Sequence, residues 1–284
     1  MNKERLGLIE ILFASFLFGF LPIMVKLGNN LGAYNLSFYR ILISAISLLP
    51  LFLLFKKFKL IPFKYEKGKL VLFGAIHGFI ILGYFLAIEY LSIASAVILL
   101  YSSSIWIVLF SNLILKEKIT NRTIFALIVS FIGLILILSP TNFFLKESLF
   151  GSIAGLLAGI GFGLVYVLSK TFKKYDKVSL TFWQNLIAIP FVIPLLFINP
   201  ILTFSTKDIW IILLIGVVFT TLPFILVYKG FEKVKAQKGG VIILLDIIFP
   251  ILLAFIIFSE FPTVIETVGG LLIILGSFIV FNQK

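Results

Sequence analysis

Residues 36–40 (LSFYR) and residues 180–184 (LTFWQ) match in apolar, hydroxyl and aromatic character at a separation of 144 positions. The same separation aligns Pro50 with Pro194 further along the chain. Leu and Ile coincide often in any apolar sequence, whereas matched prolines are harder to obtain by chance. The pattern therefore predicts a chain built from two similar halves.

The composition is that of a membrane protein. Of the 284 residues, 61% are hydrophobic and only 13% are charged, and the mean hydropathy is +1.20. A soluble domain averages about 45–50% apolar and about 25% charged residues, so this excess of apolar surface is expected to face lipid. The formal net charge of +12 lies mainly in the links between apolar runs, which indicates membrane topology and argues against a nucleic-acid partner.

Two residue counts exclude common kinds of reactive site. The chain has no cysteine and a single histidine, His77. Disulfides, thiolate metal sites and histidine clusters are therefore excluded. We expect no metal, no cofactor and no enzyme activity.

Apolar runs long enough to cross a bilayer recur through the whole chain. A membrane-spanning helix needs about 20 mainly apolar residues. Ten runs qualify: residues 6–28, 34–55, 70–90, 94–115, 122–140, 149–169, 179–199, 208–228, 240–258 and 264–281. The longest link, residues 56–69, has no room for a soluble domain. We therefore predict an all-α integral membrane protein.

Lys and Arg residues predict the orientation of these spans. With the N-terminus in the cytoplasm, most of the 24 Lys and Arg residues fall on the cytoplasmic side, in agreement with the positive-inside rule. Both termini are then cytoplasmic, and the protein is expected in the cell (plasma or inner) membrane. Each half, residues 1–141 and residues 142–284, has five spans, an odd number, so the halves insert in opposite directions. Inverted repeats around a midplane site are typical of secondary transporters.

Several short motifs mark particular places along the predicted spans. They are Gly19 followed by Lys26, Gly163 followed by Lys170, Arg40 early in the second span, Tyr84-x-x-Ala87 at the end of the third, and Glu117 and Glu260 closing the fourth and ninth. In these features the whole chain resembles the EamA type of the drug/metabolite transporter superfamily. The resemblance implies transport of amino acids, other small metabolites or drugs, and a central cavity between the halves.

The chain departs from that family at two places. A proline common in the middle of the fourth span is replaced around residues 102–104 (SSS), whereas the ninth span keeps Pro250. Gln184 is the second-half partner of Arg40, so a symmetric pair of charges is not expected. The substrate therefore does not transfer from any one relative.

Asp246 is the sharpest candidate for the transport chemistry. It lies inside the ninth span, four residues before Pro250, which cannot donate the backbone bond that the Asp246 carbonyl would accept. A charged group within a membrane costs on the order of 2.5–3.5 kcal/mol and normally faces a cavity or a partner. We expect a substrate-amine contact or a proton carrier. A structural ion pair and a protonated, hydrogen-bonded acid remain open alternatives.

Two further polar residues lie inside spans. Arg40 could bind a substrate carboxylate in a bidentate manner, or it could extend to the interface and bond to helix-end carbonyls. His77 has the intrinsic chemistry for proton coupling. It also lies between Gly74 and Gly78, where a packed histidine bonded to a neighbouring helix is the alternative.

The remaining candidate cavity residues are aromatic or hydrogen-bonding side chains. They are Tyr84, Tyr101, Ser103, Trp106, Tyr166, Gln184 and Tyr228. The resemblance places the helices of the tyrosines and of Trp106 near the cavity, and lining of this kind suits a largely apolar or zwitterionic solute. For any single aromatic residue, packing or lipid contact is the alternative.

Two sets of residues are expected to be structural. Glu117 and Glu260 end equivalent helices, where a carboxylate is unfavourable without a partner, so each is expected to bond to the adjoining turn, while Lys170 is expected to extend toward the interface. Gly155, Gly159 and Gly163 recur every four residues and form a smooth ridge for close helix packing. That packing can occur within one chain or between two, so a homodimer remains open.

These observations favour a secondary transporter that moves a small organic solute, an amino acid or related metabolite, by alternating access, with export as one direction. Its partners are then the solute and the lipid bilayer. Proton coupling through Asp246 or His77 is a further hypothesis, and uniport is open. A flippase for lipids or lipid-linked sugars is the main alternative. A membrane-embedded enzyme would need a reactive cluster that the sequence lacks, and a structural subunit or receptor would have its cavity filled.

Overall fold

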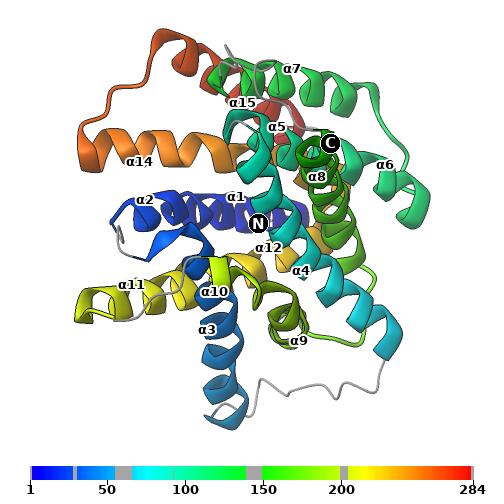
Figure 1. The fold of residues 1–284 in the computed structure, drawn as a ribbon. Helices are drawn as coiled ribbons and strands as arrows, with labels where there is room; N and C mark the ends of the chain where they lie inside the picture. Colours follow the sequence, from blue (N-terminus) through cyan, green and yellow to red (C-terminus); the bar gives the residue numbers. More distant parts are fainter. Residues whose placement is uncertain are drawn as a thin grey trace.

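The computed structural model describes residues 2–27, 31–54, 66–91, 93–138, 149–198 and 204–282, and all regular structure in these ranges is helical (Figure 1). All ten predicted spans are present as helices long and apolar enough to cross a membrane. The predicted all-α membrane fold is therefore confirmed. The lysines of residues 55–65, Lys146, Lys284 and the side chain of Lys26 lie outside the described part.

The first half contains α1 (Lys3–Phe18), α2 (Phe20–Leu27), α3 (Gly32–Leu54), α4 (Lys67–Tyr90), α5 (Ile93–Tyr101), α6 (Ser103–Leu115) and α7 (Asn121–Leu138). The second half contains α8 (Leu149–Ser169), α9 (Lys177–Val192), α10 (Leu195–Ile198), α11 (Thr206–Gly216), η1 (Val217–Thr221), α12 (Leu222–Lys233), α13 (Ala236–Ile242), η2 (Ile243–Ile247), α14 (Ile248–Phe258) and α15 (Val264–Phe281).

Large apolar side chains such as Leu53 and Val264, each at least 80% exposed, point outward, as expected of a bundle whose solvent is lipid.

Four spans are interrupted near their middle. The first breaks between α1 and α2, at Gly19, and the fourth breaks between α5 and α6, at Ser102. The eighth contains a π-helical turn, η1, and the ninth contains a 3₁₀ turn, η2, just before Pro250. Interruptions of this kind leave backbone groups outside the regular helix pattern and occur often at functional sites.

The helices pack in reciprocal pairs across the two halves. α4 packs on α8 and α9, and α12 and α11 pack on α1 and α3 in the same way. A Cβ added to Gly163 would lie 2.7 Å from the Cβ of Trp106, and one added to Gly19 would lie 2.5 Å from the Cβ of Phe249. These contacts join residues that are equivalent at shifts of 144 and 143. The two halves therefore use the same packing positions.

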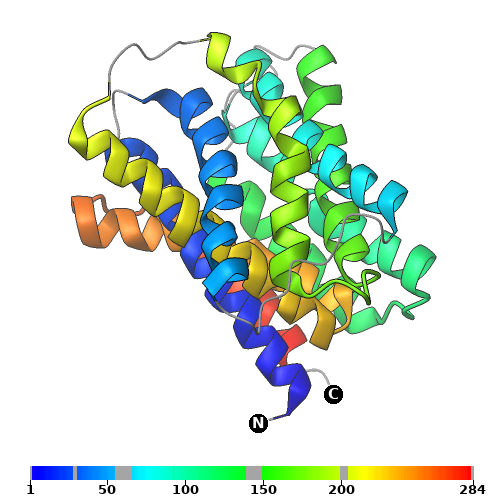
Figure 2. The ribbon, with the colours of Figure 1, turned by 90° about the horizontal axis from the view of Figure 1, so that it is seen from below.

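Both chain ends lie at one end of the bundle (Figure 2). We call this end the terminus face. An even number of spans requires this arrangement, because each span reverses the side on which the chain emerges. By the same alternation α3, α6, α8 and α12 run toward this face, and the described residues that follow α6 and α12 include Lys116 and Lys235.

Candidate functional site

A cavity of about 650 Å³ lies between the two halves. Most of its lining is apolar, and its polar side chains are Ser37, Arg40, His77, Tyr84, Tyr101, Asp246 and Glu266. The lining residues come from the parts of the spans that are remote from the terminus face, for example Pro22 in α2 and Glu266 in the first turn of α15. A volume of this size falls in the range of about 300–1,000 Å³ that small organic ligands occupy.

Asp246 lies on the interrupted part of the ninth span and borders the cavity together with Pro250. Its side chain is buried, and its Oδ1 atom has no hydrogen-bond partner. The described residues include no cation within 4.0 Å of this carboxylate. The structural ion pair considered as an alternative for Asp246 is therefore not formed by the described residues.

Arg40 lies on α3 and also borders the cavity. Its Nε atom is buried without a hydrogen-bond partner. Helix-end carbonyls, the alternative partners that the sequence leaves open, accept no bond from it among the described residues. The described cavity wall thus presents one guanidinium and, from the other half, the carboxylates of Asp246 and Glu266.

His77 is almost completely buried on α4, where it borders the cavity. Its ring packs edge to face on Phe224, with centroids 5.1 Å apart. Neither ring nitrogen has a hydrogen-bond partner among the described residues, so these residues do not form the expected bond to a neighbouring helix. Close packing of α4 on α9 occurs instead at Gly74 and Gly78, where an added Cβ would lie 2.5 and 2.6 Å from side-chain carbons of α9.

Two of the predicted tyrosines border the cavity and two do not. Tyr84 and Tyr101 contribute to the lining. Tyr166 is instead fully buried and stacks on a ring of α12, and Tyr228 donates a hydrogen bond of 2.6 Å to Gln184 Oε1. Tyr166, Gln184 and Tyr228 therefore form a core on the terminus-face side of the cavity.

Ser103 and Trp106, on α6, also lie outside the cavity lining. Ser103 is fully buried, and its hydroxyl has no hydrogen-bond partner. Trp106 packs against the glycine ridge of α8, whose Gly159 would bring an added Cβ within 2.2 Å of the Leu99 carbonyl. The ridge, which begins at Gly155, is therefore covered by helices of the same chain and does not offer a surface to a second copy.

Glu117 makes contacts different from those expected. Its Oε1 atom lies 2.7 Å from Lys170 Nζ, and its Oε2 atom accepts a bond of 2.8 Å from the backbone N–H of Ala236. Lys170 also donates a bond of 2.5 Å to the Val234 carbonyl. The expectations that Glu117 pins its own hairpin and that Lys170 extends to the interface were wrong, because both residues instead join the first half to the second. Glu260, the equivalent of Glu117, is exposed and borders a second pocket.

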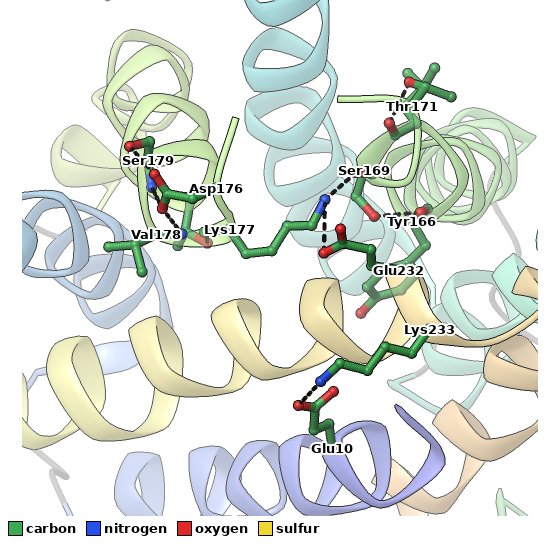
Figure 3. Close-up of polar contacts among 12 residues, drawn as sticks. Glu10, Tyr166, Ser169, Thr171, Asp176, Lys177, Val178, Ser179, Glu232 and Lys233 are labelled. Carbon is green, nitrogen blue, oxygen red and sulfur yellow. Dashed lines mark hydrogen bonds and ion pairs between the residues drawn. The ribbon is translucent and has the colours of Figure 1, made fainter. Parts of the chain in front are cut away.

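Further ion pairs close the terminus face around this contact. Glu10 on α1 pairs with Lys233 on α12 (Figure 3). Lys177 on α9 lies 3.7 Å from a carboxylate oxygen of Glu232 and donates a bond of 3.1 Å to the Ser169 carbonyl. Lys238 on α13 bonds to a carboxylate of α1 at 2.5 Å. The cavity is therefore separated from this face by a layer of paired charges.

The chemistry available in the cavity is recognition of a solute. Within the described ranges no group of three or more His, Cys, Asp or Glu residues could hold a metal ion. The cavity instead combines one cation, carboxylates, phenols and a large apolar wall, which can orient a small molecule by its polar ends. A family model described as the EamA-like transporter family matches residues 5–139 and, a second time, residues 149–282.

The chain belongs to the EamA-like transporter family. It is 28% identical to an uncharacterised transporter of Archaeoglobus fulgidus, over 84% of this chain and 82% of that protein. It is 25% identical to the pseudopaline exporter CntI of Pseudomonas aeruginosa, over 77% of this chain and 76% of that protein. Human solute carrier family 35 member G1 is 26% identical over 64% of this chain and 52% of its own length. These relatives support a transporter of a small solute and not an enzyme.

A solved crystal structure has the same fold as this EamA-like transporter. Its TM-score is 0.84 at 14% sequence identity, and the match covers 98% of this chain and 99% of the other. At this identity the likeness describes the fold alone.

Sequence reasoning missed several residues of the lining. Phe18, Phe162 and Glu266 border the cavity of this EamA-like transporter. Phe18 and Phe162 are two of 33 phenylalanines, so no composition signal distinguishes them. Glu266 forms a capping box with Thr263 at the start of α15, and that local role gives no indication that the residue also faces a cavity.

Proposed function

We propose that this EamA-like protein is a secondary transporter that carries an amino acid or related small metabolite by alternating access. The observation that carries the proposal is the position of the 650 Å³ cavity. It lies between the halves, remote from the terminus face, and paired charges separate it from that face. A solute bound in the cavity can then reach the terminus face once the ion pairs that close this face rearrange.

The two halves are proposed to be inverted repeats, residues 1–141 and residues 142–284. The family model matches each half separately, and equivalent glycines make equivalent contacts in both. Inverted repeats give alternating access a simple basis, because each half can adopt the conformation of the other. The central site then opens to one side at a time.

Asp246 and His77 are the proposed proton-coupling residues. Both residues border the cavity. One carboxylate oxygen of Asp246 and both ring nitrogens of His77 lack hydrogen-bond partners among the described residues. Tyr84 and Tyr101 are proposed to contact the solute from the same wall. Arg40 completes the charged part of the site.

The terminus face is proposed to be cytoplasmic in the cell membrane, because the lysine-rich links converge there and cytoplasmic loops carry an excess of Lys and Arg. The cavity then lies toward the outside. Export is the proposed direction, supported by the Pseudomonas aeruginosa relative, which is a pseudopaline exporter.

Counterflow in proteoliposomes tests the proposal. Vesicles preloaded with a mixed pool of unlabelled amino acids are presented with single labelled amino acids, and protein-free vesicles serve as the control. Uptake that depends on the matching internal solute supports the assignment, and repetition with a pH gradient reports coupling. Folded protein that gives no signal across the panel would contradict the amino-acid assignment.

A second pocket favours one alternative, the movement of lipids or lipid-linked sugars. This pocket, of about 360 Å³, shares Pro22, Pro250, Ile251 and Glu266 with the central cavity and lies between α2, α14 and the start of α15. Such a lateral extension could admit an acyl chain from the membrane. Accelerated exchange of fluorescent lipids between leaflets, with no counterflow of soluble solutes, would favour this function.

A further inference from the structure

The cation in the cavity wall is the feature that the described fold leaves without a counter-charge. Arg40 borders the cavity from α3, one turn after Ser37, which borders it too. Its Nε atom is buried without a hydrogen-bond partner. Among the described residues, no carboxylate oxygen lies within 4.0 Å of its guanidinium.

Three buried or partly buried lysines of the same chain, in contrast to Arg40, form ion pairs. Lys170, Lys233 and Lys238 are partly or fully buried, and each pairs with a carboxylate of another helix. A charged group inside a membrane is costly unless it is paired or faces an aqueous cavity. The described residues therefore supply carboxylate partners for these three lysines and supply none for Arg40.

The second half shows that the scaffold itself does not need a cation at this place. Gln184 is equivalent to Arg40 at a shift of 144. It is fully buried, and its Oε1 atom accepts the Tyr228 hydroxyl at 2.6 Å. The same helix position is thus filled in one half by a neutral residue with an internal partner. In the other half it is filled by a cation that borders the cavity and has no carboxylate partner among the described residues.

We infer that Arg40 binds a carboxylate of the transported solute, so that the substrates are small carboxylates or zwitterions and not simple organic cations. This inference rests on the proposed transport function and specifies its substrate class. A guanidinium matches the planar, two-oxygen geometry of a carboxylate through paired N–H···O bonds. Asp246, on the wall contributed by the second half, and Glu266 near the mouth stand available for an amine.

The experiment is a binding measurement that does not depend on transport. Thermal unfolding of the purified full-length protein is followed by tryptophan fluorescence with probes that differ only in their charged groups. One series is phenylalanine, 3-phenylpropionate, phenylalanine amide and phenethylamine, and a second is norleucine, hexanoate and hexylamine. Probes with a carboxylate are expected to stabilise the protein, and the amine-only probes are not.

Arg40→Gln is expected to weaken binding of the carboxylate probes by roughly tenfold to a hundredfold, the loss typical of a hydrogen bond to a charged group. Arg40→Lys should keep part of the binding, because it retains the charge. Lys207→Gln, an exposed charge on α11 outside the cavity lining, is the matched control and should bind as the wild type does. The chain has no cysteine, so Arg40→Cys can be modified with an aminoethyl thiosulfonate, which restores a cation and should restore binding to a folded variant.

Three outcomes would overturn the inference. They are stabilisation by amine-only probes alone, equal carboxylate binding by wild type and Arg40→Gln, and no carboxylate-dependent stabilisation in either series. Carboxylate binding that depends on Arg40 without counterflow would contradict the transport function and leave the anion site intact. Counterflow of solutes that lack a carboxylate would contradict the anion site and leave transport intact.

Discussion

Replacing Lys170 by methionine removes one buried charge from the layer that closes the terminus face. In the folded protein Lys170 bonds to Glu117 at 2.7 Å and to the Val234 carbonyl at 2.5 Å. Methionine fills a similar volume but donates neither bond. Glu117 then keeps only the backbone N–H of Ala236 as a partner, and its negative charge remains in a mostly buried place.

The size of the effect follows from this residual charge. Breaking a buried ion pair costs roughly 3–5 kcal/mol, because the partner left behind is still desolvated. The side chains of Lys170 and Glu117 are each 14% exposed. Water therefore still solvates part of the Glu117 carboxylate, and the loss of stability is smaller than for a fully buried pair. We expect Lys170→Met to lower the free energy of unfolding by about 2–4 kcal/mol.

A double-mutant cycle measures this cost by unfolding in mixed micelles. The double variant Glu117→Gln with Lys170→Met removes both charges, so it should lose less stability than the two single losses added together. Glu66→Gln is the control, because the Lys69–Glu66 pair is about 30% exposed on both sides and such pairs contribute about 0–1 kcal/mol. A loss of under 1 kcal/mol for Lys170→Met, or strict additivity in the cycle, would refute the reasoning.

Three shorter predictions follow from the packing, the cavity and the repeat. Gly159→Ala should lower the melting temperature strongly, because the added Cβ would lie 2.2 Å from a carbonyl oxygen. The control Gly270→Ala should leave it unchanged, because no atom lies within 4 Å of its added Cβ. Equal melting temperatures for the two variants would contradict this. Asp246→Asn should abolish the pH dependence of counterflow, because the amide cannot take up and release a proton as the carboxylate can, and a wild-type profile in the variant would remove Asp246 from proton coupling. The repeat maps the Glu117–Lys170 pair onto Glu260 and Lys26. Cysteines at these two positions should therefore be joined by a bifunctional maleimide long enough to span a Lys–Glu pair, whereas no cross-link in folded protein would contradict the equivalence.

The sequence predicted the spans well because their signal is local. Each span is an uninterrupted apolar run, and its length alone satisfies the thickness of the bilayer. The break in the ninth span could also be anticipated from Pro250. The π-turn of η1 could be anticipated in the same way from Pro223, which cannot donate a backbone bond to the Phe219 carbonyl. The break at Ser102 could not, because no proline stands near it in the sequence.

Contacts across the halves could not be predicted in the same way. Glu117 and Glu260 end equivalent helices, and a local argument treats them alike. Glu117 bonds to Lys170 and Ala236, which are 53 and 119 residues away in the sequence, and Glu260 borders a pocket. Partners of this kind depend on how the helices assemble, and one sequence without the fold does not specify them.

The rotation of each helix about its axis decides which of the predicted side chains face the cavity. Tyr84 and Tyr101 border it, whereas Tyr166 and Tyr228 are buried among other helices. The spans carry apolar residues on all sides, because lipid and protein interior are equally apolar. A hydrophobic stripe that would orient a helix of a soluble protein is therefore missing, and the facing residues cannot be read from periodicity.

Equivalent positions of the two halves carry the same residue where helices pack closely, and different residues where one half places a charge on the cavity wall. Gly19 and Gly163 are equivalent and make equivalent close contacts. Arg40 is equivalent to neutral Gln184, and at a shift of 143 Asp246 is equivalent to neutral Ser103. In the proposed alternating-access mechanism, a change at a packing position would disturb both conformations of the repeat, whereas positions on the cavity wall are constrained by the solute. Departures from the repeat that place a charge on the wall are therefore the positions most directly connected with what the protein carries.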